Sequence, residues 1–187
     1  VMERACGGDL RDWAKQQQQQ GETNTLAARS FVAQVARALV FLHNHDIMHR
    51  DVKPDNVLLQ EIGGDTVVLA DFGLAAWVGS ADAQRRCGTP GYMAPEILNG
   101  HYLTWTPTVD IFSLGAVAYY LFTTRLLVSG RNLQELIMAN KAPRFRINAK
   151  KLPADAYAFV REMCLAEPLE RPTAQQALGH SWLLFEP

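Results

Sequence analysis

The sequence of 187 residues has few cysteines: Cys6, Cys87 and Cys164, which lie far apart and form no Cys-x-x-Cys pair. Disulfide-dependent secreted domains are rich in cysteine, and structural zinc sites need closely spaced ligands. An odd, scattered set of three fits neither class and favours a reducing compartment, so we expect a cytoplasmic or nuclear protein. We also expect Cys6 to be a small buried residue rather than a reactive one.

The chain also lacks an excess of charge, with 18 basic and 19 acidic residues and a formal net charge of -1. Nucleic acids and anionic membranes attract clustered positive charge, so composition supports neither as a partner. The longest strongly apolar stretch without a charge covers residues 111–124, which is shorter than the roughly 20 residues that a membrane span needs. No basic segment followed by an apolar run opens the sequence. We expect a soluble protein without a membrane partner.

The remaining composition, 48% hydrophobic with 13 glycines and 9 prolines, is typical of one globular domain over residues 1–187. Residues 14–24 are rich in glutamine and predict a solvated polar loop. From Thr25, which we expect to be the N-cap, apolar residues recur at helical spacing and predict a helix that ends near His45.

Two β-rich runs follow, residues 57–59 and 67–69, and the intervening Gly63-Gly64-Asp65 predicts a hairpin. Residues 72–108 are rich in glycine, proline and threonine and predict a long ordered loop, which in a compact domain is usually functional. The chain after Val109 reads as helices. The pattern therefore predicts an α+β fold that is mainly helical and carries a small β-hairpin.

Short polar motifs occur along the chain in a fixed order. They are His49-Arg50-Asp51, Lys53, Asn56, Asp71-Phe72-Gly73, Gly88-Thr89-Pro90, Ala94-Pro95-Glu96, Asp110 and Arg171. A single tripeptide of this kind is more often part of an ordinary loop. Together, their order and spacing resemble the C-terminal lobe of eukaryotic protein Ser/Thr kinases. The segment from Arg171-Pro172-Thr173 to His180-Ser181-Trp182 is most similar to the calcium/calmodulin-dependent group.

The resemblance implies a protein-kinase-like fold and ATP-dependent transfer of a phosphoryl group to a protein substrate, with ATP and Mg²⁺ as cofactors. Such an enzyme needs a carboxylate that faces the substrate hydroxyl and oxygen ligands that face the metal. By the resemblance, Asp51 orients the hydroxyl, Asn56 and Asp71 bind the metal, and Lys53 lies near the transferred phosphate. The residues around Lys53, together with Thr89, are similar to Ser/Thr rather than Tyr kinases.

The resemblance also assigns a set of positions around the nucleotide: Met2, Glu3, Ala5, Asp9, Asp55 and Leu58. Met2 matches the gatekeeper, and Glu3 and Ala5 match hinge positions whose backbone meets adenine. Leu58 would form the floor under the ring.

Other matched residues are structural by the resemblance. His49 and Phe72 would pack in an apolar column anchored by Asp110. Glu96 and Arg171 would form a buried ion pair.

The sequence departs from the family in two places. It contains neither a glycine-rich phosphate loop nor a Val-Ala-Ile-Lys-like strand, so we expect the N-terminal lobe to be absent and the chain alone to be inactive without that lobe. Many relatives also carry a phosphorylated Ser or Thr two residues before the Cys-Gly-Thr cysteine, where it pairs with the residue matching Arg50. Arg85 stands there instead, so we expect Ser80 or Thr89 to be the local hydroxyl available for modification.

Substrate preference is weakly encoded. Asp9 and Asp55 favour a basic residue near the target hydroxyl, although Tyr120 stands where Arg-selective relatives often carry Glu.

Two alternatives remain. The chain could belong to a pseudokinase or scaffold that binds without catalysis, which the combination of Asp51, Asn56 and Asp71 disfavours. It could also belong to a small-molecule phosphotransferase, which the peptide-docking motifs from Gly88 to Glu96 disfavour.

Overall fold

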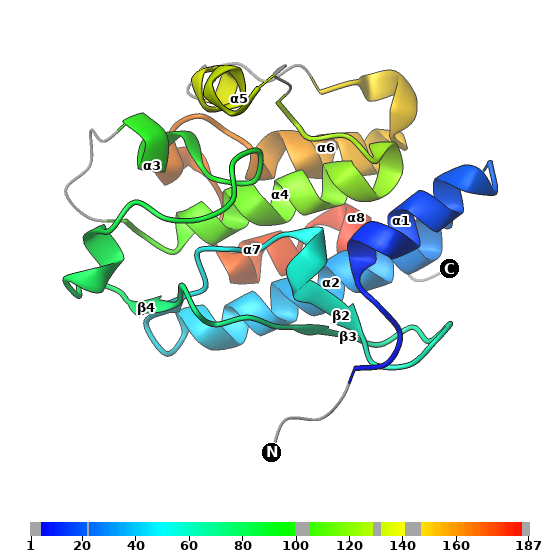
Figure 1. Ribbon diagram of the computed structural model, residues 1–187, viewed down its shortest axis with the longest axis horizontal. Coiled ribbons are helices and arrows are strands. Elements are labelled where there is room, and N and C mark those ends of the chain that lie inside the picture. The colour runs from blue at the N-terminus through cyan, green and yellow to red at the C-terminus, as the bar shows by residue number, and fades with distance from the viewer. Residues whose placement is uncertain (1–4, 22, 100–104, 129–131, 141–146, 185–187) are drawn as a thin grey trace.

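The computed structural model describes residues 5–21, 23–99, 105–128, 132–140 and 147–184. Helices make up most of the described chain, and two small sheets lie at one side (Figure 1). The helices are α1 (Leu10–Gln19), α2 (Thr25–His43), α3 (Pro95–Asn99), α4 (Thr108–Thr123), α5 (Leu133–Asn140), α6 (Ala154–Met163), α7 (Ala174–Leu178) and α8 (Ser181–Leu184). The strands are β1 (Ile47–Met48), β2 (Val57–Leu59), β3 (Val67–Leu69) and β4 (Ala76–Trp77), and the short 3₁₀ turns are η1 (Pro54–Asn56), η2 (Asp82–Gln84), η3 (Ala149–Lys151) and η4 (Pro168–Glu170).

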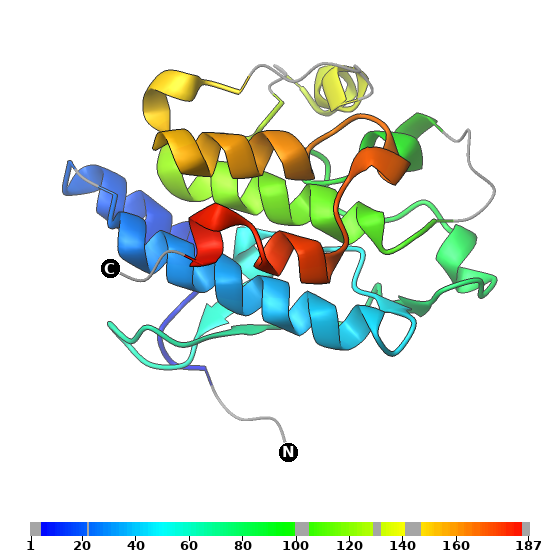
Figure 2. The ribbon, with the colours of Figure 1, turned by 180° about the vertical axis from the view of Figure 1, so that it is seen from behind.

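Helix α4 is the centre of the core and packs between α2 and α6, as seen from behind in Figure 2. It is apolar on all sides, which is the pattern of a fully buried helix, and its residues from Val109 to Thr123 are all buried. Gly115 allows α6 to approach closely, because a Cβ at this position would lie 2.6 Å from Cys164 Sγ. The helix ends at Thr124, which adopts a left-handed conformation.

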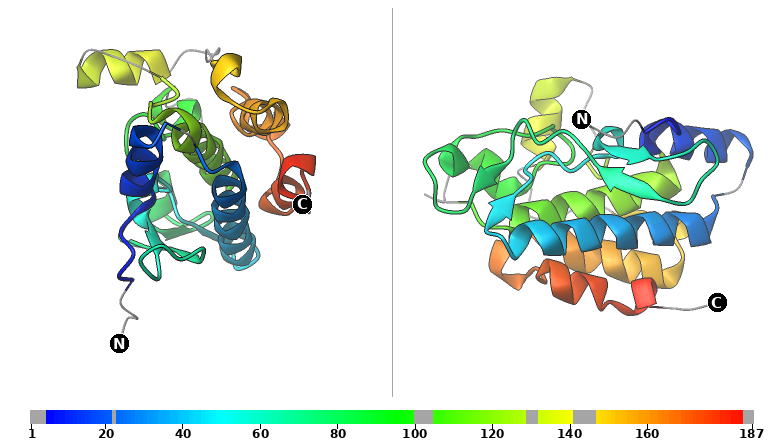
Figure 3. Two further views of the ribbon diagram at one scale, coloured as in Figure 1. Left: turned by 90° about the vertical axis from the view of Figure 1, so that its right-hand side faces the viewer. Right: turned by 90° about the horizontal axis from the view of Figure 1, so that it is seen from below.

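Helix α2 presents its apolar face to the core. The hairpin flanks it on one side and α7 on the other (Figure 3). Asn24 caps the helix by accepting the Ala27 amide at 3.0 Å, so the predicted cap at Thr25 was wrong by one residue. By length and composition alone α2 could cross a membrane, but its buried residues, such as Phe31 and Leu39, belong to the hydrophobic core.

The predicted hairpin is confirmed. Strands β2 and β3 pair antiparallel with Val57 opposite Leu69 and Leu59 opposite Val67. A second pair, β1 with β4, joins Met48 to Ala76 and so brings the chain after the hairpin back to the segment before Asp51. The sheets therefore place two polar loops next to each other.

Three expectations need correction. The glutamine run is not a loop, because α1 continues to Gln19 and only the following turn is irregular; glutamine is a good helix former. Cys6 is exposed rather than buried, since it lies in the irregular N-terminal segment that runs along β2. The predicted loop over residues 72–108 is interrupted by β4, η2 and α3.

Candidate active site

Asp110 anchors the loop that carries Asp51. Its fully buried carboxylate accepts the backbone amides of His49 and Arg50 at 2.9 and 2.8 Å. It also contacts His43 Nε2 at 2.9 Å. Because Asp110 lies in the first turn of α4, the positive end of the helix dipole favours its negative charge. The loop is thereby fixed to the central helix, and Arg50 is held at a φ of 65°, in the left-handed region that non-glycine residues rarely adopt.

His49 connects this loop to the end of the hairpin. Its Nδ1 accepts the Asp51 amide at 3.3 Å, and its Nε2 lies 3.0 Å from the carbonyl oxygen of Ala70, directly before Asp71. Both hydrogen bonds form when Nε2 carries the proton, because Nε2 then donates to Ala70 while Nδ1 accepts from Asp51. Phe72 packs edge-on against the His49 ring at a centroid distance of 5.0 Å, but half of Phe72 remains exposed.

Asp51 lies at the centre of a polar cluster and is only 7% exposed. Its Oδ2 is 2.5 Å from Lys53 Nζ and 3.1 Å from Asn56 Nδ2, and its Oδ1 accepts the Thr89 hydroxyl at 2.7 Å. Lys53 also donates to Thr89 Oγ1 at 2.9 Å. Three donors from two separate chain segments therefore fix the orientation of one carboxylate.

Asn56 and Asp71 are brought together by the hairpin. The Ala70 amide donates to the Asn56 carbonyl at 2.8 Å, which extends the β2–β3 pairing by one step and places Asp71 beside Asn56. Asp71 has a φ of 62° and an exposed side chain that accepts the Gly73 amide at 3.1 Å. Since Asn56 Nδ2 points to Asp51, its side-chain oxygen is the atom that could bind a cation. Carboxylate and amide oxygens suit Mg²⁺.

These residues do not form a complete metal cage. No group of three or more His, Cys, Asp or Glu side chains that could hold a metal occurs within the described ranges. Asn56 and Asp71 would supply two oxygen ligands, so a bound Mg²⁺ would take the others from nucleotide phosphates and water, as is usual for this ion.

The Arg50 side chain holds the segment after Asp71 in place. It donates to the carbonyl oxygens of Leu74 at 2.6 Å, Asp82 at 2.6 Å and Arg85 at 3.4 Å. All three acceptors are backbone atoms, so the guanidinium is engaged without a phosphate. Nearby, burial raises the pKa of Cys87, although the positive charge of Arg50 opposes this effect.

The edge assigned to the nucleotide is formed by the N-terminal segment and β2. The amides of Cys6 and Gly7 donate to Gln60 and Leu59, and the Leu59 amide donates to Gly8. This pairing brings Asp9 opposite Leu58 and places Ala5, half-buried, at its start.

Two of the assigned nucleotide positions, Met2 and Glu3, lie outside the described residues. Asp9 Oδ1 also has a structural role, because it caps α1 by accepting the Asp12 amide at 2.9 Å.

Glu96 and Arg171 form a buried bidentate ion pair, with both nitrogen–oxygen distances at 2.7 Å. Arg171 makes further hydrogen bonds to the carbonyls of Leu165, Thr108 and Ala166. The pair ties α3 to the segment between α6 and α7.

Sequence reasoning missed several polar contacts of the site. Arg11 Nη2 lies 2.9 Å from Asp55 Oδ2, and His43 contacts Asp110. Arg11 sits in the first turn of an amphipathic helix, where a solvated charge is the usual interpretation, and no motif marks it. His43 gave only a weak signal as a polar residue on an apolar helix.

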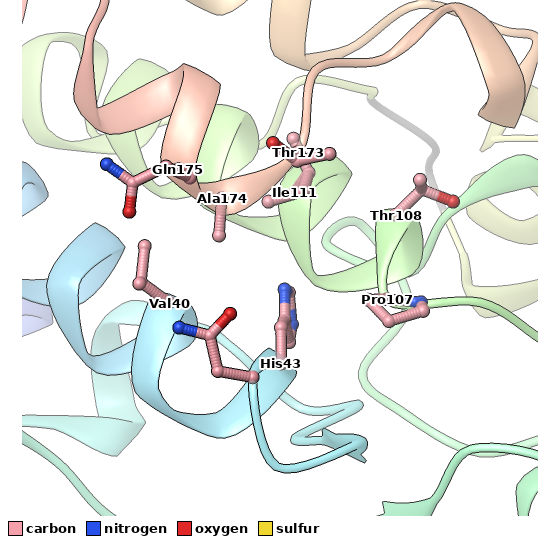
Figure 4. Close-up of a pocket in the computed structure, with 9 residues that line it drawn as sticks. Val40, His43, Pro107, Thr108, Ile111, Thr173, Ala174 and Gln175 are labelled. Carbon is pink, nitrogen blue, oxygen red and sulfur yellow. The ribbon is translucent and has the colours of Figure 1, made fainter.

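A cavity of about 380 Å³ lies behind the Asp110 anchor, between the end of α2 and the beginnings of α4 and α7. Figure 4 shows His43 and Val40 on one side of it, Ile111 and Thr108 on another, and Ala174 on α7. The sequence analysis assigned no role to this place.

Comparison with known proteins agrees with this arrangement of the Asp51 loop, the β2–β3 hairpin and the segment that Arg50 holds in place. The family described as protein kinase domain matches residues 1–183, and the chain belongs to this family. It is 32% identical over 98% of its length to a probable serine/threonine-protein kinase 2 of Plasmodium falciparum. It is 35% identical over 98% of its length to a probable myosin light chain kinase of Dictyostelium discoideum. The chain spans 36% and 52% of the lengths of these relatives.

Proposed function

We propose that this chain carries the catalytic loop of an ATP-dependent protein serine/threonine kinase, which transfers the γ-phosphate of ATP to Ser or Thr hydroxyls of proteins. The observation that carries the proposal is the Asp51 carboxylate, nearly buried and held by Lys53, Asn56 and Thr89. The names of relatives that include a serine/threonine-protein kinase and a myosin light chain kinase support the same substrate class.

In this proposal Asp51 orients the substrate hydroxyl and accepts its proton, because a carboxylate in fixed orientation loses little freedom when the alcohol binds. Lys53, which already bridges Asp51 and Thr89, offers positive charge to the transferred phosphate. Asn56 and Asp71 would hold Mg²⁺, and a bound ion would supply positive charge to the phosphate oxygens of ATP.

The nucleotide would lie along the edge formed by Ala5, Asp9 and Leu58. We propose that full activity requires an N-terminal lobe with a glycine-rich loop and a strand lysine, since these parts cover and orient the phosphates in the family. Arg50 supports a further point: its backbone contacts hold residues 74–85 without a phosphorylated residue. Activation by a phosphate docked on Arg50 is therefore not required.

The test is an Asp51→Asn substitution in the longest natural polypeptide that carries this sequence. Asparagine keeps the shape but cannot accept the proton, so we expect the turnover number for a Ser/Thr protein substrate to fall roughly 10²- to 10⁴-fold. Asp65→Asn, on the exposed tip of the hairpin, is the matched control and should leave turnover unchanged. Wild-type protein that binds ATP but transfers no phosphate would instead identify a pseudokinase or scaffold.

A further inference from the structure

Arg11 and Asp55 form an ion pair where α1 meets the turn that follows Asp51. Arg11 Nη2 lies 2.9 Å from Asp55 Oδ2, and the two side chains keep 39% and 29% of their exposure. Two phenols, Tyr92 and Tyr120, lie close to this pair and to each other, with ring centroids 6.3 Å apart. Burial raises the pKa of Tyr92 above its usual value, and Arg11 opposes the rise. Arg11, Asp55, Tyr92 and Tyr120 form one cluster, in which Asp55 carries the only carboxylate.

Hydrogen bonding in the cluster is incomplete. Arg11 Nε, Asp55 Oδ2 and the Tyr92 hydroxyl are buried atoms that make no well-aligned hydrogen bond among the residues that the structure describes, although Arg11 lies near enough to the Tyr92 hydroxyl to interact with it. The Arg11–Asp55 contact is therefore close but poorly aligned for a hydrogen bond. Buried polar atoms without partners are uncommon in folded proteins, and their concentration at one place points to a group that binds there.

The cluster lies within reach of a substrate that is bound at Asp51. Asp55 follows Asp51 by four residues, which limits their Cα separation to about 14 Å. Tyr92, Asp51 and Thr89 also border one narrow gap between side chains, which is too small to hold a water molecule but shows that the three residues are neighbours. A polypeptide that presents a hydroxyl to Asp51 therefore brings side chains within about four residues of that hydroxyl to the cluster.

We propose that Arg11 is a specificity-determining residue: it keeps Asp55 from selecting a basic side chain and offers its guanidinium to an acidic side chain of the substrate. This inference rests on the proposed kinase function. A substrate arginine or lysine would have to displace Arg11 from Asp55. An acidic side chain of the substrate would instead meet the Arg11 guanidinium, whose N–H donors are not all used by Asp55. Guanidinium–carboxylate pairs are strong.

The expectation of a basic preference, drawn from Asp9 and Asp55, is replaced by this inference. Asp9 Oδ1 is engaged in capping α1, and Asp55 is engaged by Arg11. The two carboxylates that suggested attraction for a basic substrate thus already have partners within the chain.

A positional-scanning peptide library tests the inference on the longest natural polypeptide that carries this sequence. For each of four positions on either side of the target hydroxyl, kcat/KM is compared for Arg, Ala and Glu. The wild type should prefer Glu to Arg at one or more positions. Arg11→Gln should raise the Arg-to-Ala ratio there roughly tenfold, because Asp55 is released for a charged hydrogen bond.

Lys15→Gln is the matched control. Lys15 lies one turn further along α1, carries the same charge and pairs with Asp12 at 3.5 Å. This variant should keep the wild-type ratios within about twofold, because its pair is exposed. The double variant Arg11→Gln with Asp55→Asn should lose the gained preference for Arg. The Arg-to-Ala ratio of kcat/KM for one variant does not depend on the fraction of that variant that is folded, so a loss of stability does not affect the comparison.

The outcomes separate the two proposals. A wild type that already prefers Arg tenfold, or an Arg11→Gln variant with unchanged ratios, overturns the role of Arg11 and leaves the kinase function intact. A wild type that phosphorylates no member of the library overturns the proposed function, and the role of Arg11 with it.

Discussion

The molecule contains two arginine–carboxylate pairs in different surroundings. Arg171 is fully buried beside Glu96, which is 4% exposed, whereas Arg11 and Asp55 retain 39% and 29%. Arg171 uses its donors on Glu96 and three backbone carbonyls, and its guanidinium also lies over the Phe112 ring at 5.1 Å. In the Arg11 pair, Arg11 Nε and Asp55 Oδ2, like the neighbouring Tyr92 hydroxyl, make no well-aligned hydrogen bond with any part of the chain that the structure describes.

The difference in burial and hydrogen bonding indicates that the Arg171–Glu96 pair is structural, whereas the Arg11–Asp55 pair can exchange partners. A buried charge is tolerated only when its partners are complete, so loss of either Arg171 or Glu96 would impair folding. The Arg11 and Asp55 side chains keep about a third of their surface exposed, so breaking this pair costs less than breaking the Arg171 pair and its groups can exchange one partner for another. Complete hydrogen bonding therefore distinguishes the Arg171 pair from the Arg11 pair beside Asp51.

The largest expected effect follows from breaking the buried pair. Arg171→Ala leaves Glu96 charged and unpaired in the core, so we expect the free energy of unfolding to fall by about 3–5 kcal/mol. Arg11→Ala should lower it by at most about 1 kcal/mol, because exposed pairs contribute little. Urea denaturation followed by circular dichroism measures both values.

A double variant sharpens this test. Replacing both partners, Glu96→Leu with Arg171→Met, removes the stranded charge and should recover most of the loss. Equal destabilisation by Arg171→Ala and Arg11→Ala would show that burial and satisfaction of hydrogen bonds do not distinguish the two pairs.

The second expected effect concerns the anchor of the catalytic-type loop. Asp110→Asn replaces one acceptor oxygen with an NH₂ group that faces backbone donors, so one buried amide loses its partner. We expect a loss of about 1–3 kcal/mol in unfolding free energy. Asp82→Asn, at a side chain that is 75% exposed, should change stability by less than about 0.5 kcal/mol. An unchanged stability for Asp110→Asn would remove Asp110 as an anchor.

Much of the fold was readable from local pattern. The β-rich runs around Gly63-Gly64 predicted the hairpin, and the pattern after Val109 predicted helices, of which α4 is the first. The glutamine run was misread because polar composition does not argue against the last turns of a helix, where most side chains are exposed, and glutamine favours helices intrinsically. Cys6 was misread because typical burial of a residue type does not determine which face of an edge segment is covered.

The site was predictable only in part. The resemblance implied a shared role for Asn56 and Asp71, and the predicted hairpin is consistent with it, since a hairpin brings its two ends together. The ion pair of Arg11 with Asp55 joins residues 44 positions apart, and neither belongs to a sequence signature that names its partner. Left-handed Arg50 was equally hidden, because the loop is held in this conformation by Asp110 on a distant helix.

The smallest expected effect concerns a second pair of buried and exposed groups, the thiols of Cys164 and Cys6. Cys164 is buried against α4, and burial raises its pKa from 9.0 to about 12. The folded state therefore holds this proton more tightly than the unfolded state. The stabilising effect is complete below about pH 9 and is lost as the pH rises towards about 12, since the unfolded thiol ionises first.

Cys164→Ala removes this linkage. We expect the fall in unfolding free energy between about pH 8 and 10 to become smaller by about 1 kcal/mol, on top of a constant loss of packing at all pH values. Urea denaturation across this range measures the slope. Cys6→Ala, at the exposed edge, should leave the slope as it is in the wild type. If Cys164→Ala keeps the wild-type slope, the buried thiol does not contribute to alkaline destabilisation, and the contrast between core and edge holds for ion pairs but not for thiols.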